Sequence, residues 1–176
     1  MDENQSPQIL DEDGKHLYQK GEFLKAANKF AEASVAFNKQ GDELMAAEEK
    51  NNQCVALLKS NRAQAALDAV TGTDVVFEKN GDFRRQGISI ANLGSSKEAL
   101  KEWDVAARYY ERAADLLEKE GEDQLRADVL KSLAALNARK GKGLDALIAM
   151  QDGLSGVKEP TLKQKILKKL LRIRLW

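Results

Sequence analysis

Apolar and polar residues recur along this chain with the spacing of amphipathic helices, and the pattern repeats every 40 residues. Apolar pairs three positions apart, such as Ile90 with Leu93, mark one buried helix face. A fixed period of roughly 20 to 50 residues indicates stacked repeats that bury their apolar faces against one another. Each period has an alanine, and a small residue precedes it by twelve positions: Ala26, Ala66, Ala106 and Ala146, after Gly14, Cys54, Gly94 and Ala134.

Two interleaved series of turn residues, each with the same 40-residue spacing, predict where the helices end. One series precedes acidic residues, the usual signal for the start of the next helix, and consists of Gly41, Gly81 and Gly121. The other marks the turn within each hairpin and consists of Gly21, Asn61, Lys101 and Gly141. Together with Pro160, these breaks predict helices over residues 7–20, 23–39, 42–59, 62–78, 82–100, 102–119, 122–140, 142–156 and 161 to the end.

The second helix of each pair carries an Ala-x-x-x-aromatic-x-x-Ala run, which is complete in two repeats: Ala26-Phe30-Ala33 and Ala106-Tyr110-Ala113. With the small residue on the first helix, this run resembles the tetratricopeptide repeat. The 40-residue unit exceeds the roughly 34 residues of the common repeat, so the chain is similar to the longer-helix adaptors of the LGN and SNAP type. The resemblance covers residues 7–176 and implies an all-α, right-handed α-solenoid of four helical hairpins with a C-terminal capping helix.

We expect three segments in this solenoid. Residues 1–6 form a disordered acidic N-terminus, residues 7–160 form the repeats, and residues 161–176 form a basic amphipathic capping helix. The repeat boundaries are expected at about 7–41, 42–81, 82–121 and 122–160.

The composition suits helices with one buried and one wet face, because 43% of the residues are hydrophobic and 32% are charged. The formal net charge is zero, yet residues 161–176 hold six basic side chains and no acidic one. The polar N-terminus gives no secretory signal, no apolar run approaches the length of a membrane span, and the single Cys54 cannot form an internal disulfide. We therefore expect a cytoplasmic protein.

Candidate chemistry for catalysis is sparse. The single histidine, His16, is expected to be solvated, and Cys54 occupies a small-residue packing position. No cluster of residues has metal-ligand spacing, and no phosphate-binding glycine loop occurs. Acidic pairs such as Glu48 and Glu49 are expected on wet helix faces. The sequence thus predicts a protein that is not an enzyme and that needs no cofactor or metal.

The resemblance to tetratricopeptide arrays implies a binding groove lined by the first helices of the hairpins. Two positions before the small residue, the family often uses asparagine to bind a peptide backbone, and Asn52 and Asn92 match that motif. The alternative is a solvated inner face without a ligand. The other groove candidates are Asp11, Lys15, Glu48, Asn51, Val55, Ile88, Ala91, Ser95, Asp128 and Lys131.

The last sixteen residues predict a basic amphipathic helix with two possible roles. Leu170 and Ile173 follow Leu130 and Leu133 by 40 residues, so we expect them to seal the fourth hairpin. Alternatively, the helix binds a membrane surface or an acidic partner. Its basic face consists of Lys165, Lys168, Lys169 and Arg172.

The function that fits best is a non-catalytic scaffold or adaptor that binds a peptide or helix of another protein in its concave groove. A peripheral membrane or assembly factor acting through residues 161–176 and a self-associating module are the alternatives. A nucleic-acid partner is not expected, because the basic residues lie in one short helix without aromatic stacking partners.

Overall fold

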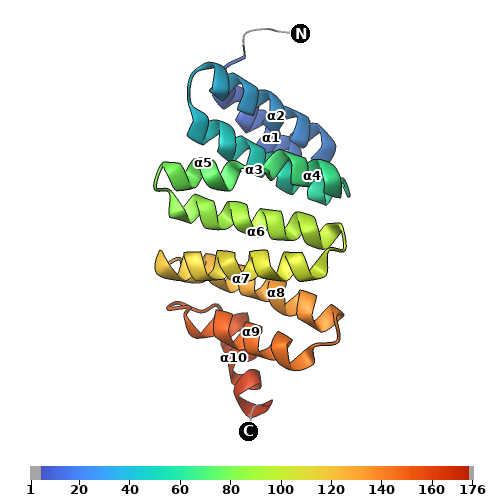
Figure 1. The fold of residues 1–176 in the computed structure, drawn as a ribbon, viewed down its shortest axis with the longest axis vertical. Helices are drawn as coiled ribbons and strands as arrows, with labels where there is room; N and C mark the ends of the chain where they lie inside the picture. The colour runs from blue at the N-terminus through green and yellow to red at the C-terminus, as the bar shows by residue number, and fades with distance from the viewer. Residues whose placement is uncertain (1–4, 175–176) are drawn as a thin grey trace.

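The computed structural model describes the backbone of residues 5–174 and the side chains of residues 5–171. Most of the expected disordered N-terminus, residues 1–4, therefore lies outside the described residues. Helical hairpins stack along the long axis, with the N-terminal helices at one end and α10 at the other (Figure 1). The helices of the described part are α1 (Pro7–Gln19), α2 (Phe23–Lys39), α3 (Glu43–Lys59), α4 (Ala63–Val70), α5 (Thr73–Lys79), α6 (Phe83–Ala99), α7 (Trp103–Lys119), α8 (Asp123–Arg139), α9 (Gly143–Ser155) and α10 (Leu162–Arg174).

This architecture confirms the expected all-α solenoid of helical hairpins. The hairpins are α1 with α2, α3 with α4 and α5, α6 with α7, and α8 with α9, and each packs on the next. The first helices of successive hairpins also meet directly, because α6 contacts both α3 and α8. Two faces result: the first-helix face, formed by α3, α6 and α8, and the second-helix face, formed by α7 and α9. The boundaries expected for the four repeats remain a proposal.

The turns follow both series of residues that the sequence marked. The glycines of both series have positive φ, and so do Asn61 and Lys101, at 59° and 64°. In each turn the next N–H bonds back to the preceding helix, as when Glu102 donates to the Lys97 carbonyl at 2.9 Å. Lys101 adopts this conformation without being glycine, and the ion pair between Lys97 and Glu102, at 2.9 Å, ties the two sides of that turn together.

In the first and third hairpins, the glycine of the first helix packs against the aromatic residue of the second helix, as the assigned register predicts. A Cβ added to Gly14 would lie 2.6 Å from the Phe30 ring, and one added to Gly94 would lie 3.0 Å from the Tyr110 ring. The repeats with smaller partners, Val70 and Met150, have Cys54 and Ala134 instead of glycine. Where the second helix has an aromatic ring, the first helix therefore has a glycine, which leaves room for that ring.

The second hairpin departs from the expected single helix over residues 62–78. Thr71 has an extended backbone and Gly72 a left-handed one (φ 85°), so the helix breaks into α4 and α5. The buried hydroxyl of Thr73 donates to the Val70 carbonyl at 2.8 Å and lies 2.5 Å from the Ser89 hydroxyl of α6. These bonds satisfy two buried hydroxyl groups, and they hold α5 against α6 despite the break.

Helix α10 packs chiefly against α9, but not through the residue that the repeat register predicts. Leu171 is buried at 6% exposure and Leu167 is half-buried, whereas Leu170 is 57% exposed. The expectation that Leu170 seals the fourth hairpin is therefore wrong. The side chains of Ile173 and Arg172 lie outside the described residues. With α9 as its main neighbour, α10 turns the Leu167 and Leu171 side inward and leaves the Leu170 side in solvent.

Candidate functional site

A hollow of about 180 Å³ lies on the first-helix face between α6 and α8, with side chains of α7 as its floor. The structure brings together here five of the residues predicted for the groove: Ile88, Ala91, Asn92, Ser95 and Asp128. All but the exposed Asp128 are half-buried. Apolar walls with a few polar groups are the composition expected of a recognition site. Tyr110, Leu117, Leu125, Val129 and Ser132 complete the lining.

The floor of the hollow is held by Tyr110, whose ring is 2% exposed. Its hydroxyl donates to the Glu98 carboxylate at 2.8 Å and lies 3.1 Å from the Ser95 hydroxyl. Burial raises the pKa of Tyr110 well above its usual value, so the phenol stays neutral. Arg139 pairs with the other Glu98 oxygen at 2.6 Å. The floor is thus fixed from α6 and α8 together.

The two asparagines predicted to bind a peptide backbone, Asn52 and Asn92, have different surroundings. Asn92 donates to the Asn51 side-chain oxygen at 3.0 Å, which links α6 to α3. Asn52 instead approaches the Glu49 carboxylate, with its amide nitrogen 3.4 Å from the nearer oxygen. Asn51 is buried and also donates to the Ala47 carbonyl at 3.3 Å. Asn51 therefore orients the Asn92 side chain through this hydrogen bond, and Asn92 itself lines the hollow.

Three of the remaining charged candidates, Glu48, Asp11 and Lys15, are already paired within the protein. Glu48 accepts from Arg85 at 2.7 Å, and Arg85 also lies over the Phe77 ring at 5.3 Å from its centroid. Asp11 accepts from Lys15 at 2.6 Å. Val55 is half-buried on α3, and Lys131 is exposed on α8 beside the hollow. The centre of the first-helix face is thus close to neutral, and Asp128 and Lys131 supply opposite charges at one edge.

Glu49 corrects the expectation of a wet acidic pair on α3, because it is only 1% exposed. Burial, and next the negative charge of Asp11, raise the pKa of Glu49 to about 7. One oxygen of Asp11, itself 8% exposed, is buried without a hydrogen-bond partner. The negative charge of Asp11 on α1 therefore acts on the buried Glu49 of α3, and the positive charge of Lys15 offsets this effect in part.

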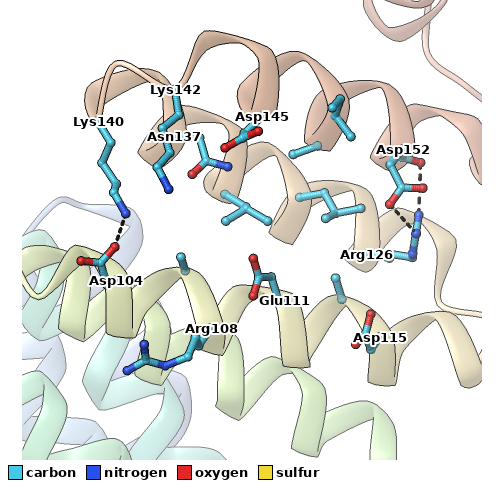
Figure 2. A pocket seen from close by; sticks show the side chains of 16 residues that line it. Asp104, Arg108, Glu111, Asp115, Arg126, Asn137, Lys140, Lys142, Asp145 and Asp152 are labelled. Atoms are coloured by element: carbon cyan, nitrogen blue, oxygen red, sulfur yellow. Dashed lines mark hydrogen bonds and ion pairs between the residues drawn. The ribbon is translucent and has the colours of Figure 1, made fainter.

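A larger cleft, of about 560 Å³, lies on the second-helix face between α7 and α9, and none of its residues belongs to the predicted groove. Figure 2 shows an ion pair near each end, Lys140 with Asp104 and Arg126 with Asp152, the latter at 2.9 Å. The floor includes Leu130 and Leu133 of α8. The sequence signal for this cleft is weak: Ile148, an apolar residue that is 53% exposed, has no place in the buried repeat pattern.

The single cysteine and the single histidine are placed as the sequence predicts. Cys54 is fully buried, with its sulfur 3.4 Å from the Ser96 hydroxyl, and burial raises its pKa to about 11. Such a thiol has little thiolate near neutral pH. His16 is exposed on α1. Within the described residues, no group of three or more histidine, cysteine or acidic side chains is arranged to hold a metal ion.

Hairpins that stack in one direction and expose two grooved faces define a helical-repeat scaffold, the architecture of adaptor proteins. Residues 8–169 match the family described as soluble NSF attachment protein, SNAP, so the chain belongs to this family. The search of curated proteins found no match. None of the helices in the described part of the chain is long and apolar enough to cross a membrane.

Proposed function

We propose that the protein is a non-catalytic adaptor that binds a peptide or helix of a partner protein across the first-helix face. The hollow between α6 and α8 carries the proposal, because it combines the apolar side chains of Ile88 and Ala91 with the carboxamide of Asn92. An apolar side chain of the partner would occupy the hollow. Asn92, which still has an N–H group and a carbonyl oxygen to offer, would hydrogen-bond the partner's backbone.

The size of the hollow favours a protein ligand. Sites for small molecules and cofactors usually measure roughly 300–1,000 Å³, and this one measures about 180 Å³. Such a volume suits one anchoring side chain of a larger partner, which is how helical segments dock into grooves. Membership of an adaptor family supports a role in holding proteins together. A cytoplasmic location belongs to the same proposal, since a lone buried thiol suits a reducing compartment.

The charges around the hollow favour a partner with an apolar or neutral contact segment. Glu48 and Asp11 are neutralised by Arg85 and Lys15, so they offer little net attraction to a strongly charged ligand. A nucleic acid, which needs a continuous basic surface, fits this face poorly.

Site-specific photocrosslinking tests which face binds. A photoreactive amino acid would replace Ile88 or Ser95 on the first-helix face and, as the matched control, Leu144 or Ile148 on the second-helix face. In an extract of the source cells, we expect the same protein to be crosslinked from Ile88 and Ser95 but not from the α9 positions. A protein captured only from the α9 positions would assign binding to the cleft between α7 and α9.

Asparagine substitutions test the hydrogen-bonding role with the partner found in this way. Changing Asn52 and Asn92 to Ala should weaken binding by about 1–3 kcal/mol, the contribution of two hydrogen bonds. Asn137→Ala is the matched control, since Asn137 is a half-buried asparagine in the opposite cleft. Titration calorimetry measures the affinities, and circular dichroism should show the same helix content in all variants. An unchanged affinity in the double variant would show that Asn52 and Asn92 do not contribute to binding.

A further inference from the structure

Helix α10 exposes a row of apolar side chains, which we call the outer stripe: Leu162, Ile166 and Leu170. Their exposed fractions are 74%, 54% and 57%. The spacing of four residues places them above one another on a single helix face. The half-buried Leu167 and the buried Leu171, which follow the outer stripe around the helix, face the body of the protein. The outer stripe is therefore surface that the fold leaves uncovered, distinct from the surface that α10 uses to attach.

Lysines border the outer stripe on both sides. At about 100° per residue, Lys163 falls beside Leu170 on one flank, and Lys165 and Lys169 fall on the other. All three are exposed, and residues 161–176 contain no acidic side chain. Lys168 is on the inner side, where its ammonium group lies 3.5 Å from the Leu154 carbonyl. An apolar row between two cationic flanks is the pattern of helices that lie in the interface of a membrane.

The repeat register argues against a tightly packed protein helix as the occupant. Leu170 stands 40 residues after Leu130, which is buried in the fourth hairpin. In the earlier repeats, a small residue four positions after this leucine position lets the next helix approach closely. A further helix could cover Leu170 as Leu130 is covered only if α10 also had a small residue at that position. By the period, that position holds Arg174, where the earlier repeats have Gly14, Cys54, Gly94 and Ala134. A fluid lipid surface needs no such close fit between backbones.

We propose that α10 binds the surface of anionic lipid membranes, with the outer stripe inserted among the lipids and the flanking lysines on the headgroups. Each lysine near an anionic surface contributes about 1 kcal/mol, and each inserted apolar side chain adds more. Helix α10 lies at the C-terminal end of the stacked hairpins (Figure 1). A second copy of α10 is a poor occupant, because its lysines would face lysines.

Vesicle sedimentation tests the proposal with the chain of residues 1–176. The probes are sucrose-loaded vesicles of phosphatidylcholine alone and of phosphatidylcholine with about one-third phosphatidylserine. We expect binding to the anionic vesicles that weakens strongly as sodium chloride is raised, and little binding to the neutral ones. Equal binding to both compositions, or no binding to anionic vesicles at low salt, overturns the proposal.

Two sets of variants assign the binding to α10. Ile166→Ser with Leu170→Ser should lower the affinity at least roughly tenfold, whereas Leu24→Ser with Val35→Ser removes equally exposed apolar side chains of α2 and should change nothing. Changing Lys163, Lys165 and Lys169 to Gln should lower the affinity roughly a hundredfold. Vesicle binding that survives the outer-stripe change overturns the proposal. So does a dimer of the unmodified protein, seen by sedimentation velocity, that the same change abolishes, because the occupant would then be a second copy.

Discussion

The two ends of the solenoid are closed by helices of equal length and opposite character. Helix α1 and helix α10 each have 13 residues. Helix α1 buries Pro7, Leu10 and Gly14 and turns mostly polar side chains outward, which is what a terminal repeat needs for solubility. Helix α10 buries Leu171 but leaves the outer stripe exposed. Helix α1 therefore covers the core with a mostly polar outer face, whereas α10 covers it and also presents an apolar surface.

The charges of the two ends differ as strongly as their packing. Helix α1 carries the buried Asp11, whose negative charge acts on the buried Glu49 of α3. The charged side chains of α10 are all basic, and Lys163, Lys165 and Lys169 are exposed. Buried charge costs stability unless it is paired or protonated, while exposed charge costs little and stays available to a ligand. We conclude that the acidic end is sensitive to pH and that the basic end is suited to binding.

The largest effect is expected from the core of the N-terminal end. Phe30→Ala should destabilise the protein by about 3–5 kcal/mol, since the ring is 3% exposed and fills the space above Gly14. In a chain of this size, that change should lower the melting temperature by roughly 10 °C or more in calorimetry. Val35→Ala, at a residue of the same helix that is 55% exposed, is the control. Equal melting temperatures for the two variants would refute the assigned packing of α1 on α2.

The corresponding residue of the C-terminal end should matter less. Leu171→Ala should cost about 2–3 kcal/mol, because Leu171 is the best-buried described residue of α10 but packs mainly against one helix. Deletion of residues 161–176 should cost about 2–4 kcal/mol, as it also removes the half-buried Leu167. Thermal unfolding measures both. A truncated chain with an unchanged melting temperature would mean that α10 contributes nothing to the core.

The sequence was sufficient for the features that depend on local spacing. The 40-residue period located the turns, including the left-handed Lys101, and it paired Gly14 with Phe30 and Gly94 with Tyr110. These are contacts within one hairpin, so the register of two neighbouring helices determines them. Five groove candidates also met in one hollow, because they lie on successive first helices that the period aligns.

Features that depend on how helices rotate and separate were not predictable in the same way. The period treated Thr73 as a helix-interior position, although Gly72 beside it was a visible signal for the break. The exposure of Leu170 reflects how α10 is rotated about its axis against α9. The spacing of residues along the chain does not determine this rotation. The burial of Glu49 and the width of the cleft between α7 and α9 likewise arise between hairpins, where spacing along the chain gives no measure.

The carboxyl pair at the N-terminal end should make stability depend on pH. Folding raises the pKa of Glu49 from 4.5 to about 7. The contribution of Glu49 to the free energy of unfolding is therefore fully present below pH 4.5 and is lost as the pH rises through 7. Glu49→Gln cannot ionise, so between pH 4 and pH 8 it should gain about 1–3 kcal/mol relative to the unmodified protein. Urea unfolding at both pH values measures this gain. Glu12→Gln, at an exposed position of α1, should show no such gain.

The difference in the free energy of unfolding between Glu49→Gln and the unmodified protein should change from pH 4 to pH 8. A constant difference would contradict the raised pKa of Glu49. A difference that grows as the pH falls would have the wrong sign, since it would require Glu49 to be stabilised in its charged form. Lys15 and Glu48 are the other charged groups that act on Glu49 besides Asp11.

The smallest effect on stability is expected at Leu170, and it separates the two ends most clearly. Leu170→Ser should change the free energy of unfolding by no more than about 0.5 kcal/mol, because the side chain is 57% exposed and already in water. Leu10→Ser is the matched change at the other end and should cost several times as much, because Leu10 is 7% exposed. Chemical unfolding of both variants measures the two values. A large loss in Leu170→Ser would mean that α10 packs in the register of Leu130 after all, and the outer stripe would then be core rather than binding surface.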